Sequence, residues 1–66
     1  MLKDYLKHYR RVNQLNIEQM AEKVGVSYLT YYRWEKGSLP SYKTSKQLAN
    51  VLHISMEELI KMYEDE

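Results

Sequence analysis

With 66 residues, no cysteine and a formal net charge of +1, the chain is expected to form one small domain spanning residues 1–66, without disulfides or thiolate metal sites. No apolar run approaches the about 20 residues that a membrane span requires, and the N-terminus lacks the apolar centre of a signal peptide. We therefore expect a cytoplasmic protein that makes no membrane contact.

The charged residues are divided unevenly along the chain. Residues 1–53 contain nine Lys or Arg and four Asp or Glu, a net charge of +5, whereas residues 54–66 contain one Lys and five Asp or Glu, a net charge of −4. A basic part of this kind can face phosphate while the acidic end points away. Because a solvated surface with an acidic end explains the same counts equally well, charge alone does not decide for nucleic-acid binding.

Apolar residues at helical spacing predict a first and a second helix. The inner face of the first is expected to carry Leu2, Tyr5, Leu6, Tyr9 and Val12. Asn16, with Gln19 three residues later, forms the pattern of a capping box that begins the second helix, and Gly25 is expected to end it. The inner face of this helix contains Met20, Ala21 and Val24. Ser27 is the expected cap of a third helix that runs to about Lys36.

The link between the second and third helices, residues 24–27, is too short for antiparallel packing. The two helices must therefore cross steeply, and the small side chain of Ala21 lets them approach closely. This geometry is that of a helix-turn-helix, which the sequence predicts over residues 17–36.

The third helix separates into two faces at about 100° per residue. The face expected to be buried contains Thr30, Tyr31, Trp34 and Glu35. The other face contains Tyr28, Leu29, Tyr32, Arg33 and Lys36. Two tyrosines and a leucine beside two cations are typical of a surface that a partner covers. In a DNA major groove, Arg33 can bind guanine through two hydrogen bonds, and the apolar groups can pack on thymine methyls.

Two further helices complete the predicted fold. After a loop at residues 38–40, Ser41 is the expected cap of a fourth helix. Its buried stripe is expected to contain Tyr42, Leu48, Ala49 and Leu52. Ser55 and Glu58 form a second capping-box pattern, which opens a fifth helix. The inner face of this last helix is expected to contain Met56, Leu59, Ile60 and Tyr63. With no alternating segment long enough for a strand, the prediction is an all-α, compact five-helix bundle.

The stretch from Leu15 to Gly37 resembles the Cro/repressor-type helix-turn-helix family, also called the xenobiotic-response-element family. Ala21, the Gly25-Val26-Ser27 corner and the Glu35-Lys36-Gly37 end stand at that family's spacing. Residues 40–59 resemble the family's fourth and fifth helices, so the resemblance covers nearly the whole chain and implies the fold of a phage-repressor DNA-binding domain.

The resemblance also implies which residues meet DNA. By position, base contacts fall to Tyr28, Leu29, Tyr32 and Arg33. Phosphate contacts fall to Asn16, Ile17, Ser27, Lys36, Ser38 and Lys43. Arg10 and Glu35 match positions that form a buried ion pair in some relatives. Taken singly, Leu29 is equally compatible with an ordinary exposed leucine, and the two lysines are distinguished only by their location.

The chain departs from the family at several positions. Ile17 stands where Gln is frequent, which removes a side-chain contact to phosphate and leaves the backbone at Asn16 and Ile17. Tyr28 and Leu29 replace Gln or other small polar residues, which makes base reading more apolar. Ser45 stands where an apolar residue is usual, so we expect a loosened fourth helix. His53 occupies a site that is often Gly.

These features predict a sequence-specific binder of double-stranded DNA, acting as a homodimeric transcriptional repressor on a two-fold symmetric operator in a bacterial or phage-infected cell. Candidate dimer contacts are Met62, Ile54 and Tyr63. Two alternatives stay open: a protein-binding module such as an antitoxin or adaptor, and the DNA-binding part of a larger regulator. No paired carboxylates, nucleophile–base pair, Gly-rich phosphate loop or metal-ligand spacing is evident, so we expect no enzymatic activity, cofactor, metal or small-molecule ligand.

Overall fold

A computed structural model describes residues 1–64, and over this range the chain folds into five α-helices without a β-strand. The helices are α1 (Leu2–Val12), α2 (Ile17–Val24), α3 (Tyr28–Trp34), α4 (Tyr42–Leu52) and α5 (Met56–Glu64). The predicted all-α fold is confirmed. Asp65 and Glu66, which belong to the acidic end and to the expected domain of residues 1–66, lie outside the described residues.

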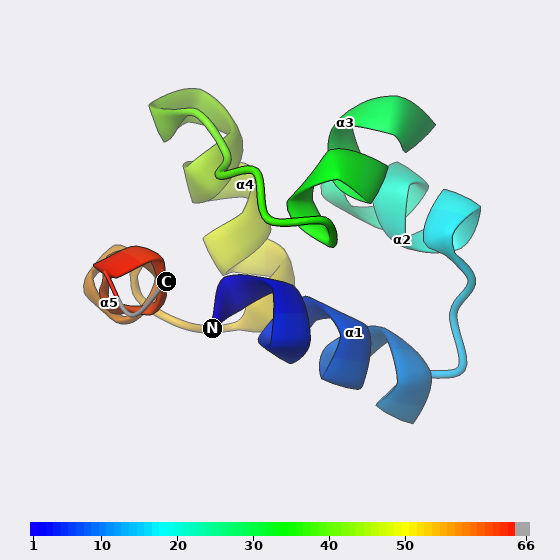
Figure 1. Cartoon of the computed structure of the whole chain (residues 1–66), viewed down its shortest axis with the longest axis horizontal. Coiled ribbons are helices and arrows are strands. Elements are labelled where there is room, and N and C mark those ends of the chain that lie inside the picture. Colours follow the sequence, from blue (N-terminus) through cyan, green and yellow to red (C-terminus); the bar gives the residue numbers. More distant parts are fainter. Residues whose placement is uncertain (65–66) are drawn as a thin grey trace.

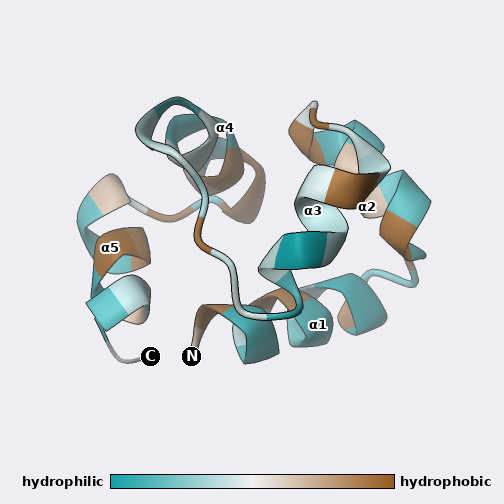
Figure 2. Cartoon of the chain, turned by 45° about the horizontal axis from the view of Figure 1, so that its top comes forward, coloured by the Kyte–Doolittle hydropathy of each residue, from teal (hydrophilic) through white to brown (hydrophobic). Residues whose placement is uncertain are grey.

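The helices are arranged so that α3 lies at the edge of the molecule. In Figure 1, α2 and α3 form one end, α5 forms the opposite end, α4 stands between them and α1 runs along one side. The start of α1 lies beside α5 in Figure 1 and in Figure 2. This arrangement surrounds α3 with protein on its inner side only.

Side-chain caps fix where the helices begin. The Asn16 side chain accepts a hydrogen bond from the Gln19 N–H at 2.7 Å, while the Asn16 N–H donates to Gln19 Oε1 at 2.8 Å. Ser27 and Ser41 cap α3 and α4 by accepting from the backbone N–H three residues later. Ser55 and Glu58 form the reciprocal pair at the start of α5, at 3.1 Å in each direction. Each cap satisfies an N–H group that has no partner within its helix.

The corner between α2 and α3 depends on Gly25. This residue has φ +93° and ψ +31°, and its N–H and that of Val26 both donate to the Ala21 carbonyl at 2.9 and 3.0 Å. An added Cβ at Gly25 meets nothing closer than Gln47 Nε2 at 3.8 Å, so the left-handed backbone, and not lack of space, favours glycine here.

The end of α3 differs from the prediction. The helix ends at Trp34, two residues before the expected Lys36. The reason is that the next N–H groups turn to nearer carbonyls: Lys36 N–H bonds Arg33 O at 3.0 Å and Gly37 N–H bonds Trp34 O at 3.3 Å. Gly37, at φ +115°, then reverses the chain.

The core is built from all five helices. Its buried apolar members are Leu2, Leu6, Met20, Ala21, Val24, Tyr31, Trp34, Leu48, Ala49, Leu52 and Leu59. The rings of Tyr31 and Trp34 pack edge to face with centroids 5.8 Å apart. Since full burial of a large apolar side chain stabilises a fold by about 1.5–3 kcal/mol, these two residues of α3 anchor it to the bundle.

Three residues that the sequence predicts to face the core are exposed. Val12 is 65% exposed because it is the last residue of α1, and Leu15 in the following loop packs against the core instead. Tyr42 is 71% exposed in the first turn of α4, where the ammonium group of Lys46 lies 5.0 Å from the centre of its ring. Ile60 is 42% exposed because it is about 100° around α5 from the buried Leu59.

The expected dimer contacts are less exposed than the sequence suggested. Met62, Ile54 and Tyr63 are partly buried and pack against the core of their own chain, and their contact with a second copy stays a prediction. The last helix instead exposes Ile60.

Ser45 and His53, the two departures from the family pattern in the second half of the chain, have structural explanations. Ser45 is buried, and its hydroxyl is 2.6 Å from the hydroxyl of Tyr63, so it joins α4 to α5 and the expected loosening of α4 is wrong. Burial raises the pKa of Tyr63, and the hydrogen bond with Ser45 offsets part of this rise. His53 ends α4 at φ +58° and ψ +41°, a left-handed conformation that explains why glycine suits this position.

Candidate nucleic-acid interface

The candidate interface is the outer side of α3. Tyr28 and Leu29 are each about half exposed, Arg33 and Lys36 are exposed, and Tyr32 is half-buried. Figure 2 shows the colours of α3 changing from hydrophobic near its start to hydrophilic near its end. The residues predicted for base contact therefore lie together on an accessible surface.

The inner side of the same helix is closed. Tyr31 and Trp34 are buried, as is Glu35 directly after the helix, and Thr30 is half-buried. The helix and the two residues that follow it thus divide into a packed side and an open side, as their helical spacing predicts.

A row of three side chains runs along the open side of α3. The rings of Tyr28 and Tyr32 stack with centroids 6.1 Å apart and an interplanar angle of 10°. The ammonium group of Lys36 lies 5.2 Å from the centre of the Tyr32 ring. Contacts of this kind each contribute about 0.5–1 kcal/mol at an exposed site, so they favour this arrangement of the row before any partner binds.

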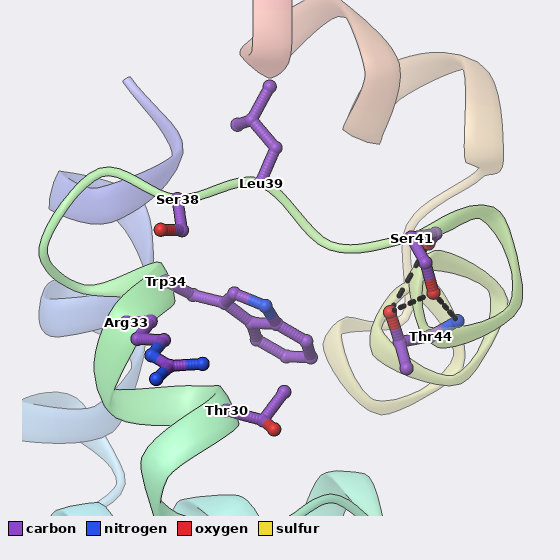
Figure 3. A pocket seen from close by; sticks show the side chains of 7 residues that line it. All are labelled: Thr30, Arg33, Trp34, Ser38, Leu39, Ser41 and Thr44. Atoms are coloured by element: carbon purple, nitrogen blue, oxygen red, sulfur yellow. Dashed lines mark hydrogen bonds between the residues drawn. The ribbon is translucent and has the colours of Figure 1, made fainter.

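Arg33 lies beside this row, at the mouth of an open pocket. The pocket has a volume of about 310 Å³ and lies between α3, the loop after it and the first turn of α4, as Figure 3 shows. Its lining residues are Thr30, Arg33, Trp34, Ser38, Leu39, Ser41 and Thr44. Within residues 1–64, the Arg33 guanidinium has no hydrogen-bond or ion-pair partner, so its donors are available to a ligand.

The three residues expected to meet phosphate ahead of α3 are placed differently from one another. Asn16 is exposed, and its Oδ1 is used by the α2 cap, which leaves its side-chain NH₂ group as a donor. Ile17 packs its side chain against the core, so only its backbone N–H can reach phosphate. The Ser27 hydroxyl donates to Thr30 Oγ1 at 2.9 Å and must rotate away to bind a phosphate.

The three residues expected to meet phosphate after α3 are exposed. They are Lys36, Ser38 and Lys43. The Ser38 N–H donates to the Arg33 carbonyl at 3.0 Å, which ties the loop to the end of α3. Lys43 lies in the first turn of α4, next to the pocket residues Ser41 and Thr44.

A buried ion pair holds the end of α3 against α1. Arg10 Nε donates to Glu35 Oε2 at 2.7 Å and Arg10 Nη2 donates to Glu35 Oε1 at 3.0 Å, which is the two-bond geometry of an arginine–carboxylate pair. Arg10 also donates to the Leu15 carbonyl at 3.3 Å, and the Tyr31 hydroxyl donates to Glu35 Oε2. The network links α1, the loop before α2 and the end of α3.

The ionisation of this network follows from its contacts. Burial alone raises the pKa of Glu35, but hydrogen bonds from Arg10 and Tyr31 outweigh it and hold the pKa below the ordinary value of 4.5. Burial, together with the hydrogen bond to Glu35, raises the pKa of Tyr31. The hydrogen bond to Glu35 raises the pKa of Arg10. Glu35 is therefore an anion at neutral pH, and both of its partners remain donors.

Sequence reasoning missed two polar contacts. The sequence indicates Tyr31 only as an apolar core residue, yet its hydroxyl completes the coordination of Glu35. The spacing of these two residues on one helix, four apart, was the available signal. The contact between Ser45 and Tyr63 joins residues 18 apart in sequence, and no local pattern indicates it.

Neither a metal site nor a membrane span was found in the part of the chain that the structure describes. Residues 1–64 contain no group of three His, Cys, Asp or Glu side chains placed to hold a metal ion. Likewise, no helix in this range combines the length and the apolar character needed to cross a membrane.

Comparison with known proteins gives consistent results. The profile of the helix-turn-helix family matches residues 6–59. An uncharacterized HTH-type transcriptional regulator of Bacillus subtilis is 36% identical over 62 residues, which cover 92% of this chain and 53% of that protein. A second one, of Methanocaldococcus jannaschii, is 36% identical over 66 residues, which cover 98% of both chains. The chain thus spans about half the length of the first relative and nearly all of the second. No solved structure matches significantly.

Proposed function

The chain belongs to the helix-turn-helix family of DNA-binding transcription regulators, and from this premise we propose that it recognises a specific duplex sequence by placing α3 in the major groove. The observation that carries the proposal is the open side of α3, where Arg33, whose guanidinium has no partner among residues 1–64, stands beside exposed apolar groups. The family is one of regulators and not a class of enzymes.

In the proposed complex, each outer residue of α3 has a distinct task. Arg33 donates two hydrogen bonds to the O6 and N7 atoms of a guanine. Tyr28, Leu29 and Tyr32 pack against base edges, and the tyrosine hydroxyls bond to bases or phosphates. This division follows from chemistry, because a guanidinium offers a planar pair of donors whereas leucine offers none.

Phosphate contacts on both sides of α3 fix its position in the groove. Before α3, the donors are the side chains of Asn16 and Ser27 and the backbone N–H of Ile17 at the start of α2. After α3, the donors are Lys36, Ser38 and Lys43. Their exposure supports this assignment, since a phosphate contact requires an accessible donor.

The binding unit is proposed to be a homodimer on a two-fold symmetric operator. One α3 of seven residues reaches only a few base pairs, so useful affinity requires two copies about one helical turn of DNA apart. We assign a repressor role, because occupying an operator is sufficient to exclude other proteins, whereas activation needs an additional contact. We expect the protein to act where this DNA is, in the cytoplasm of a prokaryotic cell.

Selection from random duplexes tests the proposal. The expected result is enrichment of a two-fold symmetric sequence, bound by two chains, with an affinity that falls steeply between 50 and 200 mM salt, as is typical when roughly six or more phosphates are contacted. Recovery of no preferred sequence, or binding indifferent to salt, would contradict it.

A second function has one observation in its favour. The open side of α3 is rich in tyrosine and leucine, and the net charge of the chain is only +1, so this surface also suits a protein partner, as in an antitoxin or adaptor. The variants Arg33→Ala and Tyr32→Ala separate the two functions. Loss of DNA binding in both supports the regulator, whereas unchanged DNA binding with loss of a protein complex supports the alternative.

A further inference from the structure

The first turn of α3 exposes an aliphatic side chain on the outer side of the helix. The Ser27 hydroxyl donates to the Thr30 hydroxyl at 2.9 Å, so in the free chain the polar side chains nearest the start of α3 are bonded to each other. The Tyr28 ring is stacked on Tyr32. Leu29 is left as the aliphatic side chain of this turn, with 52% of its surface exposed.

Leu29 and Arg33 form a second row, parallel to the row of Tyr28, Tyr32 and Lys36. They are four residues apart on one helix, which places their Cα atoms about 6 Å apart along its axis. Successive base pairs are about 3.4 Å apart along the DNA axis. For a helix that lies along the groove, the Cα atoms of Leu29 and Arg33 therefore stand about two base steps apart, and we place the bases that they meet at a similar separation.

From this placement we infer that Leu29 reads the C5 methyl group of a pyrimidine within about two base pairs of the guanine that Arg33 reads. A leucine side chain has no donor or acceptor, and the methyl of thymine is the apolar group that a base presents in the major groove. The same contact accepts 5-methylcytosine, whose methyl group lies at the same ring position. The preferred ligand is a duplex in which a methylated pyrimidine stands near a guanine, and replacing it by uracil or cytosine weakens binding. This inference rests on the proposed function.

The neighbouring row lies on the same open side of α3. Tyr28 stacks on Tyr32, and the ammonium group of Lys36 lies over the Tyr32 ring. A base without the methyl group forfeits the contact with Leu29.

The test uses a duplex obtained by selection and exchanges single thymines for uracil, which removes the methyl without changing any hydrogen-bonding group. Each half-site is expected to contain one sensitive thymine, close to the guanine that Arg33 contacts. Exchanging that one thymine should weaken binding about fourfold, which is the effect of burying one methylene-sized group. Comparing cytosine with 5-methylcytosine at that position, each paired with guanine, tests the methyl on another pyrimidine, and the methylated duplex is expected to bind more tightly.

Two variants assign the effect to its residue. Leu29→Ala is expected to bind the thymine and uracil duplexes equally, whereas the control Ile60→Ala, another exposed aliphatic residue, keeps the fourfold difference. Because Leu29 is half exposed, its truncation leaves the fold intact, which circular dichroism verifies.

The outcomes are distinguishable. Sequence-specific, salt-dependent binding in which no single uracil exchange alters the affinity overturns this inference and leaves the proposed function standing. A methyl effect that persists in Leu29→Ala also overturns it. Failure to select any duplex contradicts the proposed function itself, and this inference with it.

Discussion

The two sides of α3 differ in how completely their contacts are made within the chain. On the inner side, Tyr31, Trp34 and Glu35 are buried, and the polar atoms of Tyr31 and Glu35 have hydrogen-bond partners. On the outer side, Leu29 is half exposed and the Arg33 guanidinium has no partner within residues 1–64. One short helix thus uses its inner residues for stability and its outer residues for recognition. Substitutions on the inner side should change the free energy of unfolding, and those on the outer side should change DNA affinity.

The largest expected effect lies on the inner side. Arg10→Ala leaves the Glu35 carboxylate buried without its cation, and loss of one partner of a buried pair typically costs about 3–5 kcal/mol. We expect the free energy of unfolding, measured by urea denaturation, to fall by this amount. Arg11→Ala, one residue along on the exposed side of α1, is the matched control and should change stability by no more than about 0.5 kcal/mol.

The next effect lies on the outer side. Arg33→Ala removes the proposed guanine contact, which is worth about 1–3 kcal/mol of discrimination, so affinity for a selected duplex should fall about 5- to 150-fold for each half-site that the dimer occupies. Fluorescence anisotropy measures the affinity, and urea denaturation should show unchanged stability. Equal losses of affinity in Arg33→Ala and Arg11→Ala would show that Arg33 contributes only its positive charge. The outer side of α3 would then have no special role in recognition.

The contrast between the two sides follows sequence periodicity closely. The burial of Tyr31 and Trp34 and the exposure of Arg33 could all be predicted from the angle that each residue occupies on α3. The caps at Asn16 and Ser27 were equally predictable, because each depends on residues only three apart.

Periodicity failed where the outcome depended on other elements. Tyr42 shares a helix with the buried residues of α4, but only the fold shows that its side chain is exposed. The hydrogen bond between Ser45 and Tyr63 depends on how α4 and α5 pack, which no local spacing encodes. At the interface, the sequence indicated which face of α3 is exposed. The stacking of Tyr28 on Tyr32 depends on side-chain rotamers, which the sequence does not specify.

A smaller effect on the inner side appears with acid. Because the folded-state pKa of Glu35 lies below its ordinary value of 4.5, this residue contributes stability above that pH, and the contribution is lost as pH falls through the folded-state pKa. Glu35→Gln should therefore show a shallower loss of stability between neutral pH and the acid range than the parent chain. The exposed Glu22→Gln is the control, and an acid profile of Glu35→Gln identical to that of the parent would contradict the assignment.

The smallest effect tests the edge of the outer surface. If Lys43 binds one phosphate in each subunit, Lys43→Ala should reduce the slope of log affinity against log salt by about 0.9 for each phosphate that is no longer neutralised, with little change in sequence preference. Lys61→Ala, an exposed lysine of α5, should leave the slope unchanged. Equal reductions in both variants would show that the slope reports net charge and not position.

The central claim is that the outer side of α3 enters the major groove, and a titration of the ¹⁵N-labelled chain with a selected duplex, followed by amide chemical shifts, tests it most directly. We expect the largest shifts at residues 28–33, with further shifts at residues 16–17 and 36–43 and small ones throughout α5. Shifts concentrated in α1 or α5, with residues 28–33 unchanged, would contradict the account.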